Sequence, residues 1–253
     1  MPKSSNLNTK VALITGAARR IGAEIARILH QNGANVVLHY RHSKGDVVKL
    51  CRSLNKQREN SAIIVKADLS DTNTLKPLIK EAANTWGRLD ILVNNASCFY
   101  KTAIGKVSTK SWNSLIDTNL KAPFFLAQSA QAYLKKHKGS IVNILDIHAE
   151  RPMKDYSVYS ISKAGLSMAT KALARELGPL GIRVNAVLPG AIIWPEGANI
   201  LSEKIKKNII SHTALKRHGD THAIAEAVLF LVKDASYVTG VNIAVDGGRL
   251  LFL

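Results

Sequence analysis

Length and composition indicate one large α/β domain over residues 1–253. Hydrophobic residues make up 46% of the 253 residues, enough for a sizeable core, and no apolar run is long enough to cross a membrane. The formal net charge of +17 could indicate nucleic-acid binding, but the lysines and arginines are scattered and form no basic tail or stripe. We therefore expect no nucleic-acid partner and no membrane partner.

Cysteine usage and the first residues of the chain are typical of a cytoplasmic protein. Cys51 and Cys98 are too few for a disulfide framework, and no Cys/His cluster has the spacing of a zinc site. Residues 1–9 are polar and lack the apolar stretch of a signal peptide. We expect free thiols, no metal and a polar N-terminal tail over residues 1–9.

Short apolar runs alternate with longer helical segments along the chain. Seven runs have the length and composition of buried strands: residues 11–15, 35–39, 62–65, 91–93, 141–145, 183–187 and 242–245. Continuous apolar strands separated by helices are typical of a parallel sheet with helices on both faces. The sequence therefore predicts a doubly wound, seven-stranded α/β fold, in which ligands bind beyond the carboxyl ends of the strands.

The turn after the first strand has the features of a phosphate-binding loop. Gly16 and Gly22 allow a tight turn and close packing of a helix, predicted to run to about Gln31, against the strand. The start of that helix offers free N–H groups and a positive dipole to a pyrophosphate. Its place between strand and helix favours dinucleotide binding over a plain structural turn.

The residues after the second strand indicate which dinucleotide binds. NAD-binding proteins place an acidic residue there to hold the ribose hydroxyls, but residues 39–44 contain no acid. Arg41 and Ser43, with His42 nearby, could bind a 2′-phosphate through charge-assisted hydrogen bonds. We therefore expect NADPH rather than NADH, the alternative being a solvated basic loop.

Polar residues also follow the later strands. Asp68 could accept a hydrogen bond from an adenine amino group or cap the next helix. The Asn-Asn-Ala-Ser segment 94–97 could tie neighbouring strands together and line the cofactor floor. Asn119 lies inside a predicted helix, where asparagine is a mediocre residue, so we expect a local kink or a water site there. Pro189 and Gly190 would shape the wall beside the nicotinamide.

Tyr159 and Lys163 are four residues apart at the start of a predicted helix and therefore share one face. A free tyrosine has a pKa of about 10, which an adjacent ammonium group lowers. The pair could thus act as a general acid, although the same spacing also occurs on ordinary amphipathic helices. Tyr156 cannot replace Tyr159, because Ser160 stands four residues beyond it.

Together and in this order, these motifs resemble the short-chain dehydrogenase/reductase family over residues 11–248. The matching residues are Thr15, Gly16, Gly22, Asn94, Asn95, Ala96, Asn119, Tyr159, Lys163, Pro189, Gly190 and the closing segments 238–240 and 246–248. The resemblance implies a Rossmann-like fold, a nicotinamide cofactor and Tyr159 as proton donor. It also implies that Lys163 binds the nicotinamide ribose, and that Asn119 holds a water in the proton relay. It further implies a homotetramer, formed through the helices that begin near Val107 and Ser157 and through the C-terminal strand.

Departures from most of that family resemble its pteridine reductase branch. Asp146 stands where most members have a serine, and Arg20 replaces the middle glycine of the first loop. Ser97, followed by Cys98 and Phe99, replaces another glycine. The order of Arg41 and His42 differs from that branch. The resemblance implies NADPH-dependent reduction of a dihydropterin, an oxidised pterin or a dihydrofolate to the tetrahydro form.

The chemistry of these departures suits a nitrogen heterocycle. An ionised Asp146 accepts hydrogen bonds only, which suits ring N–H or amino groups, and with Tyr159 it could pass a proton to a ring nitrogen. Phe99 could stack on a flat ring, unless it is a core residue. Arg20 could bond the polar edge of the ring or a cofactor phosphate, and Ser97 the ring or the cofactor. The alternative for Asp146 is a structural hydrogen bond.

The full set of expected cofactor contacts is Gly16, Arg19, Arg20, Ile21, Tyr40, Arg41, His42, Ser43, Asp68, Leu69, Asn95, Ala96, Ser97, Tyr159, Lys163, Pro189 and Gly190. Residues 191–215, which include Trp194 and several lysines, are the expected substrate lid. The apolar tail 249–253 suggests burial at a subunit interface. Two other functions stay open: a carbonyl reductase acting on a 3-oxoacyl thioester or another ketone, and a catalytically idle protein that binds NADPH or nucleic acid.

Overall fold

The computed structural model describes residues 6–194 and 201–252. Within them, seven strands form one sheet in the order β3-β2-β1-β4-β5-β6-β7, and every neighbouring pair is parallel. The strands are β1 (Val11–Ile14), β2 (Asn35–Tyr40), β3 (Ala62–Lys66), β4 (Ile91–Asn94), β5 (Ser140–Ile144), β6 (Arg183–Pro189) and β7 (Asn242–Val245). The predicted Rossmann-like parallel sheet is confirmed.

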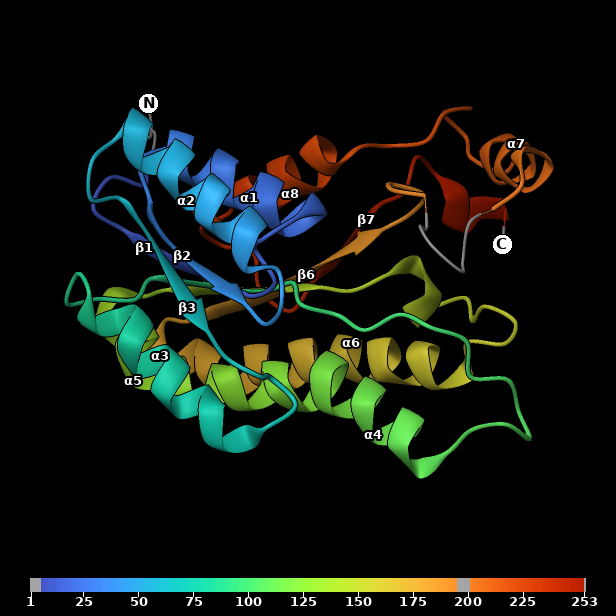
Figure 1. Cartoon of the computed structure of the whole chain (residues 1–253), viewed down its shortest axis with the longest axis horizontal. Helices are drawn as coiled ribbons and strands as arrows, with labels where there is room; N and C mark the ends of the chain where they lie inside the picture. Colours follow the sequence, from blue (N-terminus) through green and yellow to red (C-terminus); the bar gives the residue numbers. More distant parts are fainter. Residues whose placement is uncertain (1–5, 195–200, 253) are drawn as a thin grey trace.

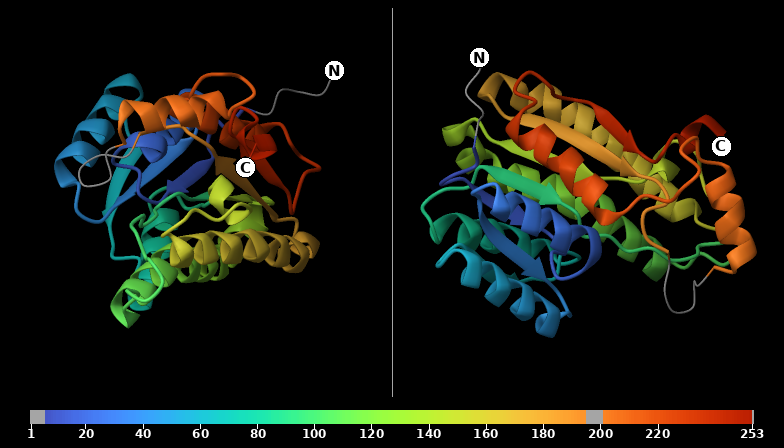
Figure 2. Two further views of the ribbon diagram at one scale, coloured as in Figure 1. Left: turned by 90° about the vertical axis from the view of Figure 1, so that its right-hand side faces the viewer. Right: turned by 90° about the horizontal axis from the view of Figure 1, so that it is seen from above.

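Helices cover both faces of the sheet (Figure 1). One face carries α1 (Arg20–Gln31), α2 (Lys44–Gln57) and α8 (Thr221–Lys233). The other carries α3 (Leu75–Asn84), α4 (Thr109–Ile116), α5 (Ala122–His137) and α6 (Ser157–Leu177). A further helix, α7 (Glu203–Ser211), lies outside these two layers near the end of the chain (Figures 1 and 2).

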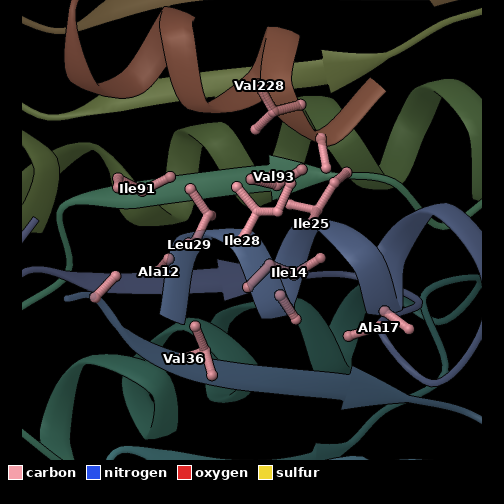
Figure 3. Packing of buried hydrophobic residues seen from close by; sticks show 14 of the residues in the cluster. Ala12, Ile14, Ala17, Ile25, Ile28, Leu29, Val36, Ile91, Val93 and Val228 are labelled. Atoms are coloured by element: carbon pink, nitrogen blue, oxygen red, sulfur yellow. The ribbon is translucent and has the colours of Figure 1, made fainter. Parts of the chain in front are cut away.

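Alternate residues of the central strands supply two hydrophobic cores. Ala12 and Ile14 of β1 pack with the α1 and α8 side, while Val11 and Leu13 pack with the α3 and α5 side. Successive side chains of a strand point to opposite faces, so a strand covered by helices on both sides has to be apolar throughout. Figure 3 shows the first of these cores, with Ile28 of α1 close to β1 and β4.

The strand ends differ from the predicted ones by one or two residues. β6 extends to Pro189, two residues beyond the predicted end, because Pro189 still pairs with Val245 of β7. β5 ends at Ile144, one residue before the predicted end, and its first residue, Ser140, pairs with Arg183. Such ends depend on where a neighbouring strand stops, which apolar runs do not reveal.

The helix is irregular at Asn119, where the sequence predicted a local kink or a water site. Asp117–Lys121 forms a π-helical turn between α4 and α5, and the chain remains helical on both sides of it. A π turn inserts one extra residue into the helix and redirects the side chains that follow. Asn119 is fully buried there, beneath α6.

Each end of the chain has one leucine packed against the rest of the molecule. The prediction of a polar tail over residues 1–9 is wrong for Leu7, which is fully buried in the α1-side core and whose backbone N–H donates to Asn32. Residues 1–5 lie outside the described part of the chain. At the other end, Leu250 is partly buried, whereas Leu251 is 80% exposed.

The predicted lid over residues 191–215 contains α7. Residues 195–200 of the predicted lid lie outside the described residues. In the rest, the Trp194 ring meets the His218 ring edge-on at 5.8 Å, and the Lys206 ammonium lies 5.9 Å from the Trp194 ring centroid. No helix in the described part of the chain is long and apolar enough to span a bilayer.

Candidate active site

A pocket of about 670 Å³ opens where the strand order reverses, between β1 and β4. Its lining comes from the segments that follow β1, β2, β3, β4, β5 and β6, together with the start of α6. This is where open parallel sheets bind ligands. Every residue that the sequence predicted for cofactor or substrate binding lines this pocket; among the predicted catalytic residues, Asn119 does not.

Two glycines shape the turn after β1. Gly16 has a φ of +63°, and a Cβ atom there would lie 3.0 Å from the Cα of Ala96. A Cβ atom on Gly22 would lie 2.4 Å from the carbonyl oxygen of Gly16 and 2.5 Å from the side-chain nitrogen of Asn95. Both positions therefore require glycine, and the turn packs directly against the segment after β4.

Hydrogen bonds hold that contact in place. The Thr15 hydroxyl accepts from the backbone N–H groups of Asn95 and Ala96, at 2.9 and 3.0 Å. The Asn95 side chain donates to the carbonyl oxygens of Thr15 and Gly16, at 2.9 and 3.1 Å. The prediction that the asparagine segment ties neighbouring strands together is confirmed, with Asn94 also donating to Asn143 across β4 and β5.

His39 of β2 accepts a hydrogen bond from the same turn, a role that the sequence did not predict. The Gly16 N–H donates to Nδ1 of His39 at 3.1 Å, so the ring proton is on Nε2, which lies 3.2 Å from the Ala67 carbonyl oxygen. Burial lowers the pKa of His39 to about 4, so the ring is neutral at neutral pH. A histidine inside an otherwise apolar strand was the available signal, because a buried ring must find partners.

The region after β2 and β3 contains an ion pair. The Arg41 guanidinium lies 2.8 Å from the Asp68 carboxylate, and both groups line the pocket. Burial alone would raise the pKa of Asp68, but hydrogen bonds from Ser70 and the charge of Arg41 outweigh it and bring that pKa below its usual value. Asp68 does not cap the next helical turn, Thr72–Thr74, because Asp71 does so.

Cations and a helix start face the pocket at the same edge. Arg19 is paired with Asp46 of α2 at the pocket rim. His42 is exposed, and Ser43 stands at the N-cap of α2 without a side-chain cap bond. These groups, with Arg41, offer positive charge and hydrogen-bond donors to an anion.

Tyr159 and Asp146 form the polar centre of the pocket. The Tyr159 hydroxyl donates to one carboxylate oxygen of Asp146 at 2.8 Å. The other oxygen accepts from the backbone N–H of His148 at 2.9 Å and caps the short turn Ile147–Ala149. The structural hydrogen bond considered for Asp146 and its contact with Tyr159 therefore occur together, one on each oxygen.

The prediction that Lys163 lowers the pKa of Tyr159 is wrong for this structure. Burial, then the charge of Asp146 and its hydrogen bond, raise the pKa of Tyr159 well above its usual value. The Lys163 ammonium lies 5.8 Å from the Tyr159 ring centroid and donates to the Ile144 carbonyl oxygen at 2.9 Å. Burial lowers the pKa of Lys163 to about 8, against the charges of Asp146 and Cys98. Tyr159 is thus held in its protonated form.

The Asn119 side chain does not line the pocket but forms hydrogen bonds to the lining residues Ser97 and Cys98. Its oxygen accepts from the Cys98 backbone N–H and the Ser97 hydroxyl, at 2.8 and 3.2 Å. Its nitrogen donates to the Cys98 carbonyl and the Ser162 hydroxyl, at 3.0 and 3.1 Å. An amide oxygen accepts two bonds and an amide nitrogen donates two, so the side chain is fully used. A relay water could meet Asn119 only through its backbone.

Phe99 is positioned by other aromatic rings. It stacks on Tyr156 at 4.7 Å between centroids, with 19° between the ring planes, and meets Tyr159 edge-on at 4.9 Å. Phe99 is 37% exposed, so it is not a core residue. Tyr156, which the sequence excluded from proton transfer, supports Phe99 in the pocket.

Several lining residues were not predicted to contact a ligand. They include Cys98, His148, Met153 and Arg249. The predicted lid 191–215 contributes Ile192, Ile193, Trp194, Leu201 and Ile209. Arg249 comes from the C-terminal turn, which the sequence marked only as an apolar tail. Among residues 6–194 and 201–252, no group of three or more His, Cys, Asp and Glu side chains could hold a metal ion.

Comparisons with known proteins cover nearly the whole chain. A family model described as "Enoyl-(Acyl carrier protein) reductase" matches residues 16–249. A 3-oxoacyl-[acyl-carrier-protein] reductase, FabG, of Staphylococcus aureus is 36% identical over 245 residues, which are 96% of this chain and 99% of that protein. Pteridine reductase 1 of Leishmania tarentolae is 34% identical over 281 residues, covering 95% and 96%.

A solved structure has the same fold. It is the crystal structure of a blue fluorescent protein from a metagenomic library in complex with NADPH. Its TM-score is 0.90 and its sequence is 35% identical, with 96% of this chain and 99% of that chain covered.

Proposed function

The chain belongs to the short-chain dehydrogenase/reductase family, and from this we propose that it is an NADPH-dependent reductase of pterins. The observation that carries the pterin assignment is the 2.8 Å hydrogen bond from Tyr159 to Asp146, beside the exposed ring of Phe99. A carboxylate at this place accepts hydrogen bonds, which a heterocycle with N–H and amino groups supplies.

The residues around the first turn fit NADPH. Gly16 and Gly22 leave a close-packed cradle that a Cβ atom would fill, at the start of α1. Arg41, His42 and Ser43 would hold the 2′-phosphate, with Asp68 orienting the guanidinium of Arg41. When bound, the cofactor supplies a hydride. Lys163 would hold the nicotinamide ribose, and Pro189 and Gly190 would form the wall beside the nicotinamide.

Tyr159 supplies the proton in the proposed reaction. A C=N bond that gains a hydride at carbon leaves electron density at nitrogen, and this nitrogen is basic enough to take a proton from a phenol of raised pKa. Asp146 holds the hydroxyl in place and keeps it protonated until then. Lys163, whose pKa is about 8, can return a proton to the phenolate.

A 3-oxoacyl thioester reductase is the second candidate, and the 36% identity to the staphylococcal enzyme supports it. A ketone gains negative charge on oxygen as the hydride arrives, and hydrogen-bond donors stabilise such a charge. An ionised Asp146 would repel it. The carboxylate therefore favours the pterin over the ketone.

A substrate panel tests the proposal. Oxidation of NADPH by the purified protein is followed by absorbance with dihydrobiopterin, dihydromonapterin, dihydrofolate and an acetoacetyl thioester. We expect turnover of the dihydropterins, inhibition by a methotrexate-like antifolate and loss of turnover in Tyr159→Phe. Turnover of the thioester with no response to any pteridine would reject the pterin assignment and support the second candidate.

A further inference from the structure

We propose that Arg249 binds the carbonyl edge of the substrate ring. With Asp146, it would select a heterocycle that carries a ring carbonyl beside its N–H or amino donors. This inference rests on the proposed pterin reduction and deepens it, because it assigns the residue that recognises the acceptor side of the ring.

The C-terminal turn is fixed over the pocket by its own hydrogen bonds and by close packing. The Asp246 carboxylate accepts from the backbone N–H groups of Gly248 and Leu250, both at 2.8 Å. A Cβ atom on Gly190 would lie 2.6 Å from the Cα of Asp246, so the turn rests directly on the end of β6. A Cβ atom on Gly248 would lie 2.7 Å from the Cβ of Ala214, which follows α7 in the sequence. Figures 1 and 2 show the chain end beside α7.

Leu250 brings the turn to the strand end that carries Asp146. Its side chain packs against a buried cluster that contains Leu145 and Ile147, the two neighbours of Asp146 in the sequence. Arg249 precedes Leu250, and both Arg249 and Asp146 line the pocket. A cation and a carboxylate from distant parts of the sequence therefore line the same pocket.

The guanidinium of Arg249 has unused donors. Its Nε atom is buried and has no hydrogen-bond partner in the described part of the chain. Burial lowers the pKa of Arg249, while the charges of Asp146 and Asp246 raise it. The Nε atom is closed off from the pocket, so a ligand would be held by the terminal N–H groups of the guanidinium, which also make no hydrogen bond with the described residues. A ligand that accepts a hydrogen bond would satisfy these donors. Arg249 can therefore donate a hydrogen bond to an acceptor atom of a ligand in the pocket.

The two charges together define the ligand. An anion drawn to Arg249 would be repelled by Asp146, whereas a neutral ring with a carbonyl and an adjacent N–H satisfies both. The carbonyl group of a simple ketone or thioester offers acceptors only, so it adds no donor to the Tyr159 hydroxyl and the His148 N–H that Asp146 already has. Phe99 adds the preference for a flat ring.

Two ligands that differ at one ring position show whether Arg249 binds the ring carbonyl or only supports the fold of the pocket. A 4-oxo pterin offers a carbonyl at the edge in question, and its 2,4-diamino analogue offers an amino group there. Binding of each to the protein with NADP⁺ is measured by calorimetry for the wild type, Arg249→Leu and Arg249→Lys. Arg52→Leu, an exposed change on α2 outside the pocket, is the matched control.

We expect Arg249→Leu to weaken the 4-oxo ligand about tenfold or more, the usual effect of losing a charged hydrogen bond. The 2,4-diamino ligand should be nearly unaffected, because a guanidinium cannot donate to an amino group. Arg249→Lys should lose less selectivity than Arg249→Leu, and Arg52→Leu none.

Two results would overturn the inference. Equal weakening of both ligands would mean that Arg249 only supports the fold, and unchanged binding of both would mean that it does not touch the ring. If the wild type binds and reduces pterins but Arg249→Leu keeps the wild-type selectivity, only the role of Arg249 is rejected. If the wild type binds neither pteridine, the proposed function fails, and the inference fails with it.

Discussion

His39 makes the first loop sensitive to acid. Its Nδ1 accepts the Gly16 N–H, and this bond is lost when the ring is protonated. The pKa of His39 is about 4 in the folded protein, below its ordinary value of 6.5, so the unfolded chain binds the proton more readily. The stability that His39 contributes is therefore complete above pH 6.5 and falls as the pH drops toward 4.

Urea unfolding of the wild type and of His39→Asn at pH 7 and pH 5 measures this contribution. An asparagine oxygen can accept the Gly16 N–H but cannot be protonated. We expect the wild type to lose about 2 kcal/mol more than the variant between these two pH values. His30, whose pKa burial also lowers, is present in both proteins and cancels. The same pH dependence in both would contradict the assignment.

For single residues, the sequence predicted which side chains form the site better than it predicted their contacts and pKa values. The spacing of Tyr159 and Lys163 predicted a shared helix face, but not that Lys163 would reach the Ile144 carbonyl. The sign of the pKa change at Tyr159 depends on its burial and on Asp146, which approaches from another element. The place of Arg249 depends on contacts with β6 and the segment after α7.

The turn between β1 and α1 packs closely against the segment that follows β4, which leaves no room for a side chain at Gly22. In Gly22→Ala, the new Cβ atom would meet the Gly16 carbonyl oxygen, so backbone has to move. We expect a loss of about 1–3 kcal/mol of stability and weaker NADPH binding, about tenfold, because the cradle is displaced. Urea unfolding and a fluorescence titration with NADPH measure the two effects.

Gly45 in α2 is the matched control for Gly22. A Cβ atom on Gly45 would meet nothing within 4 Å, so Gly45→Ala should bind NADPH as the wild type does and be up to about 1 kcal/mol more stable. Similar binding by both variants would show that the close packing at Gly22 is not needed for the cofactor.

Element order was predictable, and element geometry was not. Apolar runs separated by helical segments revealed the strands, because both faces of the sheet are buried. The asparagine inside a helical pattern predicted a disturbance at residue 119, but not that it would be the π turn Asp117–Lys121. Strand ends such as Pro189 depend on the neighbouring strand.

For the whole molecule we propose a homotetramer, as the family resemblance implies. Ile161 and Met168, seven residues apart on α6, are 48% and 64% exposed and lie on one face of the helix. A second copy would bury this face. Light scattering should give about four times the 27.5 kDa mass of one chain, and Met168→Glu should lower it. A monomeric mass for the wild type at micromolar concentration would contradict the proposal.

The exchange of Asp146 for serine tests the central claim most directly. We measure kcat/KM of Asp146→Ser and of the wild type for a dihydropterin and for an acetoacetyl thioester. A serine can donate to a ketone oxygen but loses the carboxylate that holds Tyr159 and the ring donors. We predict that the ratio of pterin to thioester activity falls at least about a hundredfold, within the usual range for a positioned catalytic group. An unchanged ratio would contradict the account.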